Sequence, residues 1–567
     1  MTSQTNPAPP LLTPLTTRRT AAEWEQFEQP QILELIRRLP EPIRPFSRGE
    51  ILAQRRQAAG FRARISQYQR SLQGPMQPSH IAALSAAKCR LKVLLWRMFP
   101  FNSLPVEIVI DIFRYAVWTS LDSSEGTLLR FRLTSVCRRW RHIAIHDQTL
   151  WNTIWFKDVK FGYQRSKLYF ERAGTSTLDL RIEDDDKSRL SPGQSMSGDD
   201  MNRILDILMM KSNQIRMLIV VVELWPPILV LLDRLHRSSR SLQQLERIEI
   251  HRTGRPYRWD GPGYPLSDYQ HALGLFNGHA QRLDYVCLNG IHLDWDRSGL
   301  TNLTALDLRR MPPDLGPSID RFCYMLESSP NLTKLTLDGA GPTGPANSAA
   351  LPFRPVFLPR LESLVLGDFL VSYAIFYAGI IHAPNVREIT LLNLVGEDHT
   401  QLFKTITGSF PQLLMLSLFS VKIRKAAENA RTMVQWLLSI PKIKFVRMGL
   451  MEPDLLDLFC VDGRLHIRND GPLMPATESP IILCPELEAI EVQQIGINSV
   501  VKFISNRKKL EVPLRKLYIH HDSFESMSPD ERAILENENY EHNFVNVTSP
   551  ATLTPVEVSI WKQVRRK

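Results

Sequence analysis

The chain has 567 residues, of which 43% are hydrophobic and 23% charged, so it has the composition of a folded protein but is too long for one compact core. Its six cysteines lie at least 24 residues apart, which excludes a CxxC metal knuckle and a disulfide-dense scaffold. The net charge of +10 comes from the ends, because residues 1–100 carry +9, the last ten residues carry +4, and the body between them carries −3. A basic nucleic-acid-binding body is therefore excluded, and no apolar run fits a signal peptide or a membrane span.

The first hundred residues divide into a polar tail and a helical region. Residues 1–20 are rich in proline and polar side chains, as in a disordered tail. Residues 21–99 predict helices, with one ending before Pro40, a second at about 48–72 and a third at about 81–98. The second is rich in arginine. We interpret its basic face as solvated, with a partner helix or an anionic surface as the alternative.

Three short phrases then follow in residues 104–156. They read LPVEIVIDIF at 104–113, LTSVCRRWRHIA at 133–144 and LWNTIWF at 150–156. Proline in the first turn suits a helix start, because its missing N–H has no partner there. Ile108, Ile112 and Phe113 are expected to share one face of this helix, and Trp151 and Ile154 to close a small core.

The order of these phrases resembles the F-box. The resemblance implies a Skp-type adaptor as partner and, through it, a cullin scaffold. The residues that it places at the adaptor surface are Leu104, Pro105, Glu107, Ile108, Ile112, Phe113, Val136, Cys137 and Trp140. One departure is the stretch 117–132, which is longer than the usual connection between the helices. We expect a surface loop there that alters the adaptor contacts.

From about residue 205 the pattern LxxLxL returns with conservative replacements. Copies begin at residues 283, 303, 332, 361, 386, 413, 443, 487 and 514, with two weaker copies at 215 and 245. The last two apolar positions point to one side of a strand, and one such unit cannot bury its apolar face alone. Prolines often stand two residues ahead of a copy, where they end the preceding helix without breaking a ladder bond. The step of mostly 25–30 residues is typical of a leucine-rich-repeat solenoid, and an ordinary α/β domain is the alternative.

The repeats are degenerate at one position. The Asn or Cys that normally bonds the turn after the strand is replaced in six copies, by Ile291, Met311, Ala340, Phe369, Val421 and Ile495. The solenoid is therefore expected to be irregular.

The whole layout resembles fungal F-box proteins with divergent leucine-rich repeats. The predicted fold class is α + α/β, with N-terminal helices and a helical F-box followed by an irregular solenoid that has parallel strands on its concave face and helices outside. The predicted parts are a disordered tail at 1–20, a helical region at 21–99, the F-box at 100–156, a linker or first repeat cap at 157–204, the solenoid at 205–545 and a basic tail at 546–567.

The function expected from this layout is that of a substrate receptor in a Skp–cullin–F-box type ubiquitin ligase, in the cytoplasm or nucleus. The alternative is a non-ligase repeat scaffold whose basic termini bind nucleic acid or other proteins. No catalytic, cofactor or metal motif is found, so we expect no enzyme activity of its own. The unknown protein substrate is expected to contact side chains beside the strand leucines: Asp307, Arg309, Thr336, Asp338, Ser417, Phe419, Arg447, Glu491 and Tyr518.

Overall fold

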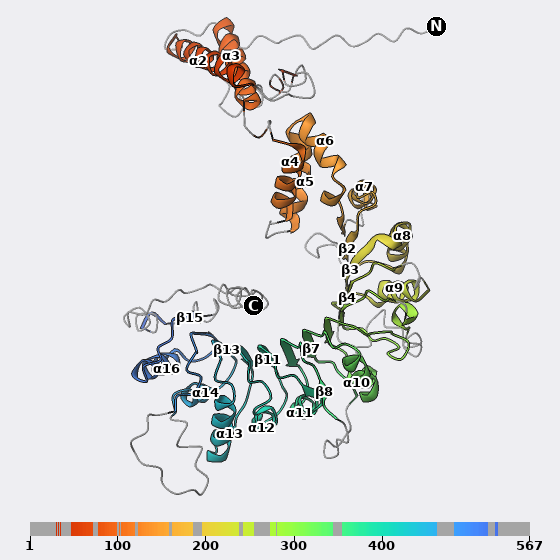
Figure 1. Cartoon of the computed structure of the whole chain (residues 1–567), viewed down its shortest axis with the longest axis vertical. Coiled ribbons are helices and arrows are strands. Elements are labelled where there is room, and N and C mark those ends of the chain that lie inside the picture. Colours follow the sequence, from red (N-terminus) through yellow and green to blue (C-terminus); the bar gives the residue numbers. More distant parts are fainter. Residues whose placement is uncertain are drawn as a thin grey trace. The chain divides into compact units, whose positions relative to one another are not determined.

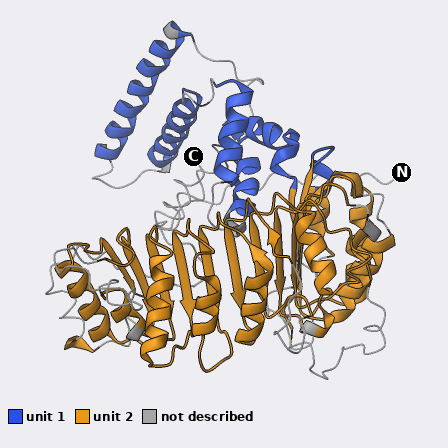
Figure 2. Ribbon diagram, turned by 60° about the horizontal axis from the view of Figure 1, so that its bottom comes forward, with its two compact units in different colours: residues 1–152, 170–176 blue, residues 153–169, 177–567 orange. Residues whose placement is uncertain are grey.

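A computed structural model describes most of the chain between residues 47 and 519. The described residues are 30, 32, 34, 35, 47–71, 78–98, 101, 104–118, 123–157, 162–184, 195–237, 242–254, 273–278, 280–343, 354–461, 481–519 and 528–530. The predicted tails at both ends and most of the first predicted helix lie outside them. The chain divides into two compact units, Met1–Asn152 with Phe170–Ser176 and Thr153–Tyr169 with Thr177–Lys567 (Figure 2).

The first unit is helical in its described residues. Its elements are α2 (Arg48–Ser71), α3 (Pro78–Arg97), α4 (Val106–Trp118), α5 (Ser123–Val136), α6 (Arg138–His146) and the 3-10 turn η2 (Gln148–Leu150). Helices α2 and α3 pack against each other and lie where the sequence predicts them. A capping box opens α2, because Glu50 N donates to Ser47 Oγ and Ser47 N donates to Glu50 Oε2. Within the described part of the chain, no helix is long and apolar enough to span a bilayer.

The stretch 117–132, which we expected to be a surface loop, is helical in its described residues, 117, 118 and 123–132. Helix α4 continues to Trp118, and α5 begins at Ser123 and packs against both α4 and α6. Arg130 of α5 is buried, with its guanidinium 4.7 Å from the centroid of the Trp118 ring. The prediction was wrong because Ser123 and Gly126 have low helix propensity, so the sequence favours a loop there. Tertiary packing stabilises the helix nevertheless.

The second unit is built on one parallel sheet. Thirteen of the described strands form it, in the order of the sequence. They are β1 (Thr153–Phe156), β2 (Leu178–Glu183), β3 (Ile215–Val222), β4 (Arg247–Arg252), β5 (Tyr285–Asn289), β6 (Ala305–Arg309), β7 (Lys334–Asp338), β9 (Ser363–Gly367), β11 (Glu388–Leu392), β12 (Met415–Phe419), β13 (Phe445–Gly449), β14 (Ala489–Gln493) and β15 (Lys516–Ile519). A small second sheet pairs β8 (Val356–Phe357) with β10 (Ile381–His382).

Helices and short turns connect most of these strands. They are α7 (Gln164–Arg172), α8 (Gly198–Met209), η5 (Ser212–Gln214), α9 (Trp225–Arg237), η7 (Leu275–Gly278), η8 (Pro313–Leu315), α10 (Ile319–Glu327), α11 (Val371–Ile380), α12 (Thr400–Ile406), α13 (Ala427–Leu438), α14 (Asp454–Leu458) and α16 (Ile497–Lys509). In Figure 1 the strands from β7 to β13 line the inner side of the curved sheet, and α10 to α13 cover its outer side. The predicted fold class, a solenoid-like α/β repeat array after N-terminal helices, is confirmed.

The sheet begins earlier than the sequence predicts. Strand β1 pairs in parallel with β2, and β2 pairs with β3, so the repeat array starts at Thr153 and not near residue 205. Within the segment 157–204, β2 and the start of α8 therefore belong to the array, whereas Phe170–Ser176 belong to the first unit. Ile154 is buried in the second unit instead of closing the helical core.

The apolar motif forms the core of the array. The middle positions of five successive motifs, Leu306, Leu335, Leu364, Ile389 and Leu416, lie side by side in register, and each is at most 2% exposed. Fully burying one such side chain stabilises a fold by about 1.5–3 kcal/mol. Because each repeat covers the apolar face of the next, the stacking that the period predicts is the source of the core.

The turns after the strands are closed by backbone geometry in place of the missing Asn. In the thirteen-stranded sheet, the residue directly after each strand from β5 to β14 has a positive φ, between 48° and 72°: Gly290, Arg310, Gly339, Asp368, Asn393, Ser420, Leu450 and Gln494. The N–H of each of the first seven donates to the carbonyl of the last residue of the next strand, as in Asn393 N to Phe419 O at 3.1 Å. The position that follows is then free to be apolar and buried, as Ile291 and Met311 are.

Candidate functional site

Helices α4, α5 and α6 enclose a small aromatic core. Val109, Phe113 and Val117 recur every four residues on α4 and are at most 3% exposed. The Phe113 ring lies 5.0 Å from that of Trp140 on α6, centroid to centroid, at 57°. Trp151 is fully buried, and its indole N–H donates to Ala144 O at 2.7 Å. The inward face of α4 is therefore fixed by packing, which determines what its other face presents.

Hydrogen bonds hold the ends of these helices together. Cys137 caps the start of α6, with Sγ accepting from Trp140 N at 3.4 Å. The Arg139 side chain donates to Leu104 O at 2.7 Å and ties the beginning of α6 to the residue before α4. The start of α4 and the start of α6 are thereby held as one piece.

A bidentate ion pair joins α4 to the turn after α6. Arg114 donates through Nε and Nη2 to the two oxygens of Asp147, at 3.0 and 2.9 Å. This hydrogen bonding raises the pKa of Arg114 above its ordinary value, although burial opposes it. Asp147 Oδ1 also accepts from Thr149, so the carboxylate caps η2 as well. The pair orients α4 relative to α6.

The outward face of α4 carries an apolar stripe. Ile108, Ile112 and Tyr115 stand at spacings of four and three residues and are 46%, 39% and 72% exposed. Val106, two residues before Ile108, is 43% exposed. Large side chains of this kind gathered on one short helix are typical of a surface that a partner covers.

Helix α5 exposes apolar side chains too. Leu128 and Phe131, three residues apart, are 52% and 38% exposed, and Val136 at the end of the helix is 43% exposed. The two neighbouring helices thus present two apolar stripes on the segment of about 50 residues that begins at α4. A domain of that size buries little surface by itself.

The structure divides the nine residues expected at the adaptor surface. Phe113 and Cys137 are 1% and 8% exposed, so they build the core and the helix cap, and the prediction of direct contact is corrected for both. Phe113 was misplaced because a spacing of five residues from Ile108 puts it on the other face of α4. The other seven reach the surface wholly or in part: Leu104, Pro105, Glu107, Ile108, Ile112, Val136 and Trp140.

Five exposed apolar residues of α4 and α5 were not predicted from the sequence: Val106, Tyr115, Trp118, Leu128 and Phe131. The spacing of Tyr115 from Ile108 and Ile112 could have identified it. Val106 is part of the first phrase, at the start of the helix that the phrase predicts. Trp118, Leu128 and Phe131 lie in the stretch 117–132, where the sequence predicts a loop, so no helical spacing pointed to them.

Comparison with protein families identifies this helical unit. Residues 101–157 match the family model described as F-box-like. The chain carries an F-box-like domain. No curated protein matches the chain. Among solved structures, a crystal structure of a Bacteroides fragilis protein is similar at 14% identity over 51% of this chain and 68% of the other, with a TM-score of 0.27, which is too low to carry an argument.

Beyond the F-box-like domain, the inner face of the sheet is more buried than the sequence predicts. Seven of the nine side chains predicted to meet a substrate are buried, at 8% exposure or less: Asp307, Thr336, Ser417, Phe419, Arg447, Glu491 and Tyr518. Their alternation along the strands was predicted correctly, but neighbouring strands lie so close that these side chains cover one another. Arg309 and Asp338 remain partly exposed, with 38% and 14% of their side chains accessible.

Two kinds of contact explain this burial. Toward the later strands, Met415, Phe445, Ala489 and Tyr518 form an apolar cluster across β12 to β15. Among the charged residues, Arg309 donates to both oxygens of Asp307, at 2.7 and 3.0 Å. Arg447 forms an ion pair with Glu491 on the next strand, with Nε 3.0 Å from Oε2. These contacts cover most of the predicted side chains, so Arg309 and Asp338 are the predicted residues best placed to meet a partner.

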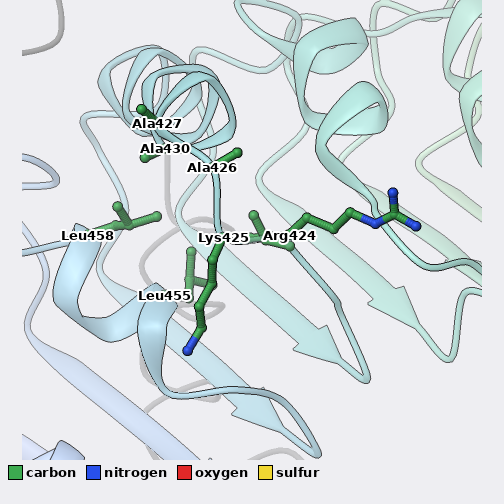
Figure 3. A pocket seen from close by; sticks show the side chains of 8 residues that line it. Arg424, Lys425, Ala426, Ala427, Ala430, Leu455 and Leu458 are labelled. Carbon is green, nitrogen blue, oxygen red and sulfur yellow. The ribbon is translucent and has the colours of Figure 1, made fainter.

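A shallow pocket of about 330 Å³ lies on the outer side of the array, between α13 and α14 (Figure 3). Its lining consists of Ile423, Arg424, Lys425, Ala426, Ala427, Ala430, Leu455 and Leu458. Figure 3 shows the Arg424 guanidinium pointing away from Leu455 and Leu458. The pocket therefore offers apolar contact but no convergent polar groups, and we assign it no chemistry.

Proposed function

We propose that this protein is the substrate-receptor subunit of a Skp–cullin–F-box type ubiquitin ligase, of the fungal type with divergent leucine-rich repeats. The F-box-like domain binds the Skp-type adaptor and, through it, the cullin, while the solenoid holds a protein substrate. The observation that carries this proposal is the pair of exposed apolar stripes on α4 and α5, inside the segment that matches the F-box-like family. On this proposal the chain works in the cytoplasm or nucleus, needs no cofactor and leaves catalysis to other subunits.

The exposed apolar area of α4 and α5 indicates which side chains should contribute most to adaptor binding. Ile108, Ile112 and Val136 each leave about two fifths of their surface accessible. Covering such side chains in a close-packed interface removes apolar surface from water, at about 25 cal/mol per Å². A handful of residues near the centre of an interface usually dominate binding, each costing about 2 kcal/mol or more on truncation. The isoleucines of α4 are therefore the expected anchors.

Binding of the purified full-length chain to a recombinant Skp-type adaptor tests the proposal. Ile108→Asp and Ile112→Asp place a carboxylate where the adaptor packs, and burying an unpaired charge is costly. We expect each substitution to weaken binding by about 30-fold or more in isothermal titration calorimetry. Both residues point away from the core, so circular dichroism of the variants should match that of the wild type.

Val395→Asp supplies a matched control. Val395 is 59% exposed and belongs to the repeat array, far along the chain from the F-box-like domain. Like Ile108→Asp and Ile112→Asp, this substitution replaces a β-branched apolar residue with aspartate. We expect it to leave adaptor affinity unchanged. Absence of binding by the wild type, or equal loss in Val395→Asp, would contradict the assignment of α4 as the adaptor surface.

The substrate side of the proposal rests on the polar residues of the sheet. Arg309 Nη1 lies 3.8 Å from Asp338 Oδ2, and the two form the most accessible part of the predicted face. Arg309→Ala/Asp338→Ala should reduce ubiquitin transfer to a captured substrate in a reconstituted ligase, while adaptor binding stays at the wild-type level. An unchanged transfer rate would move the substrate site elsewhere on the array.

A further inference from the structure

Three side chains with different metal-binding atoms meet on the inner face of the sheet, outside the F-box-like domain. Ile248 and Ile250 of β4 point into the core and are fully buried, so Glu249 and His251 of the same strand project from the opposite face. Cys287 of β5 lies directly beside Glu249 in the parallel register. Two neighbouring strands therefore bring a carboxylate, an imidazole and a thiol to one spot.

The distances suit a single small cation. The possible ligand atoms of these three residues all lie within 4.8 Å of one another, and His251 Nε2 is 3.0 Å from Glu249 Oε2. Ligands of a tetrahedral zinc ion stand about 3.4–3.8 Å apart, given metal–ligand bonds of about 2.0–2.3 Å. To reach that geometry the Nε2 and Oε2 atoms must move slightly apart, and the neutral imidazole must carry its proton on Nδ1, so that the lone pair of Nε2 faces the ion.

The surroundings leave the required atoms available. Arg247 bonds to Oε1 of Glu249 and stacks on Tyr285, with its guanidinium 3.9 Å from the ring centroid, so Oε2 is the oxygen that faces His251. Burial works against ionisation of Glu249, but the hydrogen bonds from His251 and Arg247 outweigh it and hold its pKa below the ordinary value. The carboxylate is oriented and charged before any cation arrives.

Asp307 on β6, the strand after Cys287, is not counted as a ligand. Both of its oxygens accept hydrogen bonds from Arg309, at 2.7 and 3.0 Å. Burial raises the pKa of Cys287 to about 12, and the nearby charges of Asp307 and Glu249 add to this effect. The thiol is therefore protonated and inert at neutral pH until a cation displaces its proton.

We propose that Glu249, His251 and Cys287 bind one zinc ion, with the fourth coordination position directed to the inner face of the array. A thiolate together with an imidazole selects zinc over magnesium or calcium, which prefer oxygen ligands only. Cys287 is 3% exposed while 22% of the His251 side chain is accessible, so an ion has a path from the His251 side. Three protein ligands and one open position match the geometry of zinc sites that bind a further molecule.

Cobalt is the probe that reports thiolate coordination directly. The full-length protein is treated with a chelator, desalted and titrated with Co²⁺, and the sulfur-to-cobalt charge-transfer absorption is recorded. We expect a band that saturates at one Co²⁺ per chain and that disappears when Zn²⁺ is added. Cys287→Ser should lose the band, and Cys323→Ser, which alters a partly buried thiol on α10, should keep it.

A second variant keeps the proposal testable where Cys287→Ser does not fold. His251 is partly exposed, so His251→Ala should fold and should keep the thiolate band while weakening Co²⁺ affinity by at least about tenfold. Zn²⁺ should raise the midpoint of thermal unfolding of the wild type and of Cys323→Ser, but not that of a folded Cys287→Ser. A wild type without the band, a folded Cys287→Ser that retains it, or a His251→Ala of unchanged affinity overturns the assignment.

Discussion

Gly339 and Leu450 occupy the same place in two repeats, directly after β7 and β13, yet only one of them suits its backbone. Both have a left-handed conformation, with φ of 59° and 54°. Such a φ costs a residue with a side chain roughly 1–2 kcal/mol, whereas glycine adopts it freely. The repeats thus impose one geometry on very different residues, because the N–H of each donates to the next strand.

A reciprocal pair of substitutions tests this account. Gly339→Ala should lower the free energy of unfolding by about 1–2 kcal/mol, although a Cβ there would meet its neighbours only at ordinary contact distances of 3.5 Å or more. Leu450→Gly, at a residue that is 49% exposed, should raise it by about 0.5–1 kcal/mol. Urea denaturation followed by circular dichroism measures both. Equal and unfavourable effects at the two positions would show that the turn geometry is not the cause.

His399 couples the stability of the array to pH. It is fully buried, Nδ1 accepts from Lys422 N at 2.7 Å, and Nε2 donates to Leu394 O at 3.1 Å. Burial lowers the pKa of His399 below its ordinary value, so the folded state holds the neutral ring. Below about pH 6.5 the unfolded chain therefore binds a proton that the folded chain does not.

Burial of neutral His399 should make the folded array less stable as the pH falls. The stabilisation by neutral His399 is complete above about pH 6.5 and is lost as the pH falls, with a slope of up to about 1.4 kcal/mol per pH unit. His399→Asn should flatten this slope between pH 7.5 and 5.5 in denaturant unfolding. His382→Asn, at an exposed histidine, should leave it unchanged. A slope that persists in His399→Asn would assign the effect to other groups.

At the scale of elements, a buried arginine side chain fixes α16 to the rest of the array. Arg507 is fully buried and donates to Leu483 O at 2.8 Å and to Cys484 O at 3.0 Å. Burial lowers the pKa of Arg507, yet an arginine stays charged at any physiological pH. The two hydrogen bonds fix α16 to the turn that precedes β14.

Arg507→Met should lower the free energy of unfolding by about 2–4 kcal/mol, because two buried carbonyls lose their partner. Lys509→Met, at an exposed residue of the same helix, is the matched control and should change it by less than about 0.5 kcal/mol. Thermal unfolding of both variants provides the measurement. If Arg507→Met proves as stable as the control, the apolar contacts of α16 alone hold it in place.

The elements also show what the sequence could reveal. The motif from Leu283 onward predicted the strands and the buried positions correctly, because a period of two in a stacked repeat leaves few alternatives. Strands β1 and β2 were missed, since Thr153–Phe156 also fits the end of an F-box and Leu178–Glu183 lacks the leading apolar residue. Burial of Thr336 and Tyr518 could not be predicted, because it depends on lateral neighbours more than twenty residues away in the chain.

At the scale of the whole molecule, the F-box-like domain and the repeat array differ in how they are stabilised. The repeat array buries its apolar residues between successive strands of one continuous sheet, so its repeats support one another. The F-box-like domain has a small core and leaves apolar side chains on α4 and α5 exposed. We therefore expect it to unfold at a lower temperature than the array, in a separate calorimetric transition.

Adaptor binding should shift only the first of these transitions, since a ligand stabilises the unit that binds it. At an adaptor concentration of 100 times Kd the gain is about 2.7 kcal/mol, and for a domain of 60–100 residues each kcal/mol raises the unfolding midpoint by about 4–8 °C. Differential scanning calorimetry of the chain with and without a Skp-type adaptor measures this shift. Ile108→Asp should abolish the shift of the first transition and leave the second transition in place. A shift of both transitions together would mean that the adaptor also engages the array, because the energy of binding appears only in the units that it contacts.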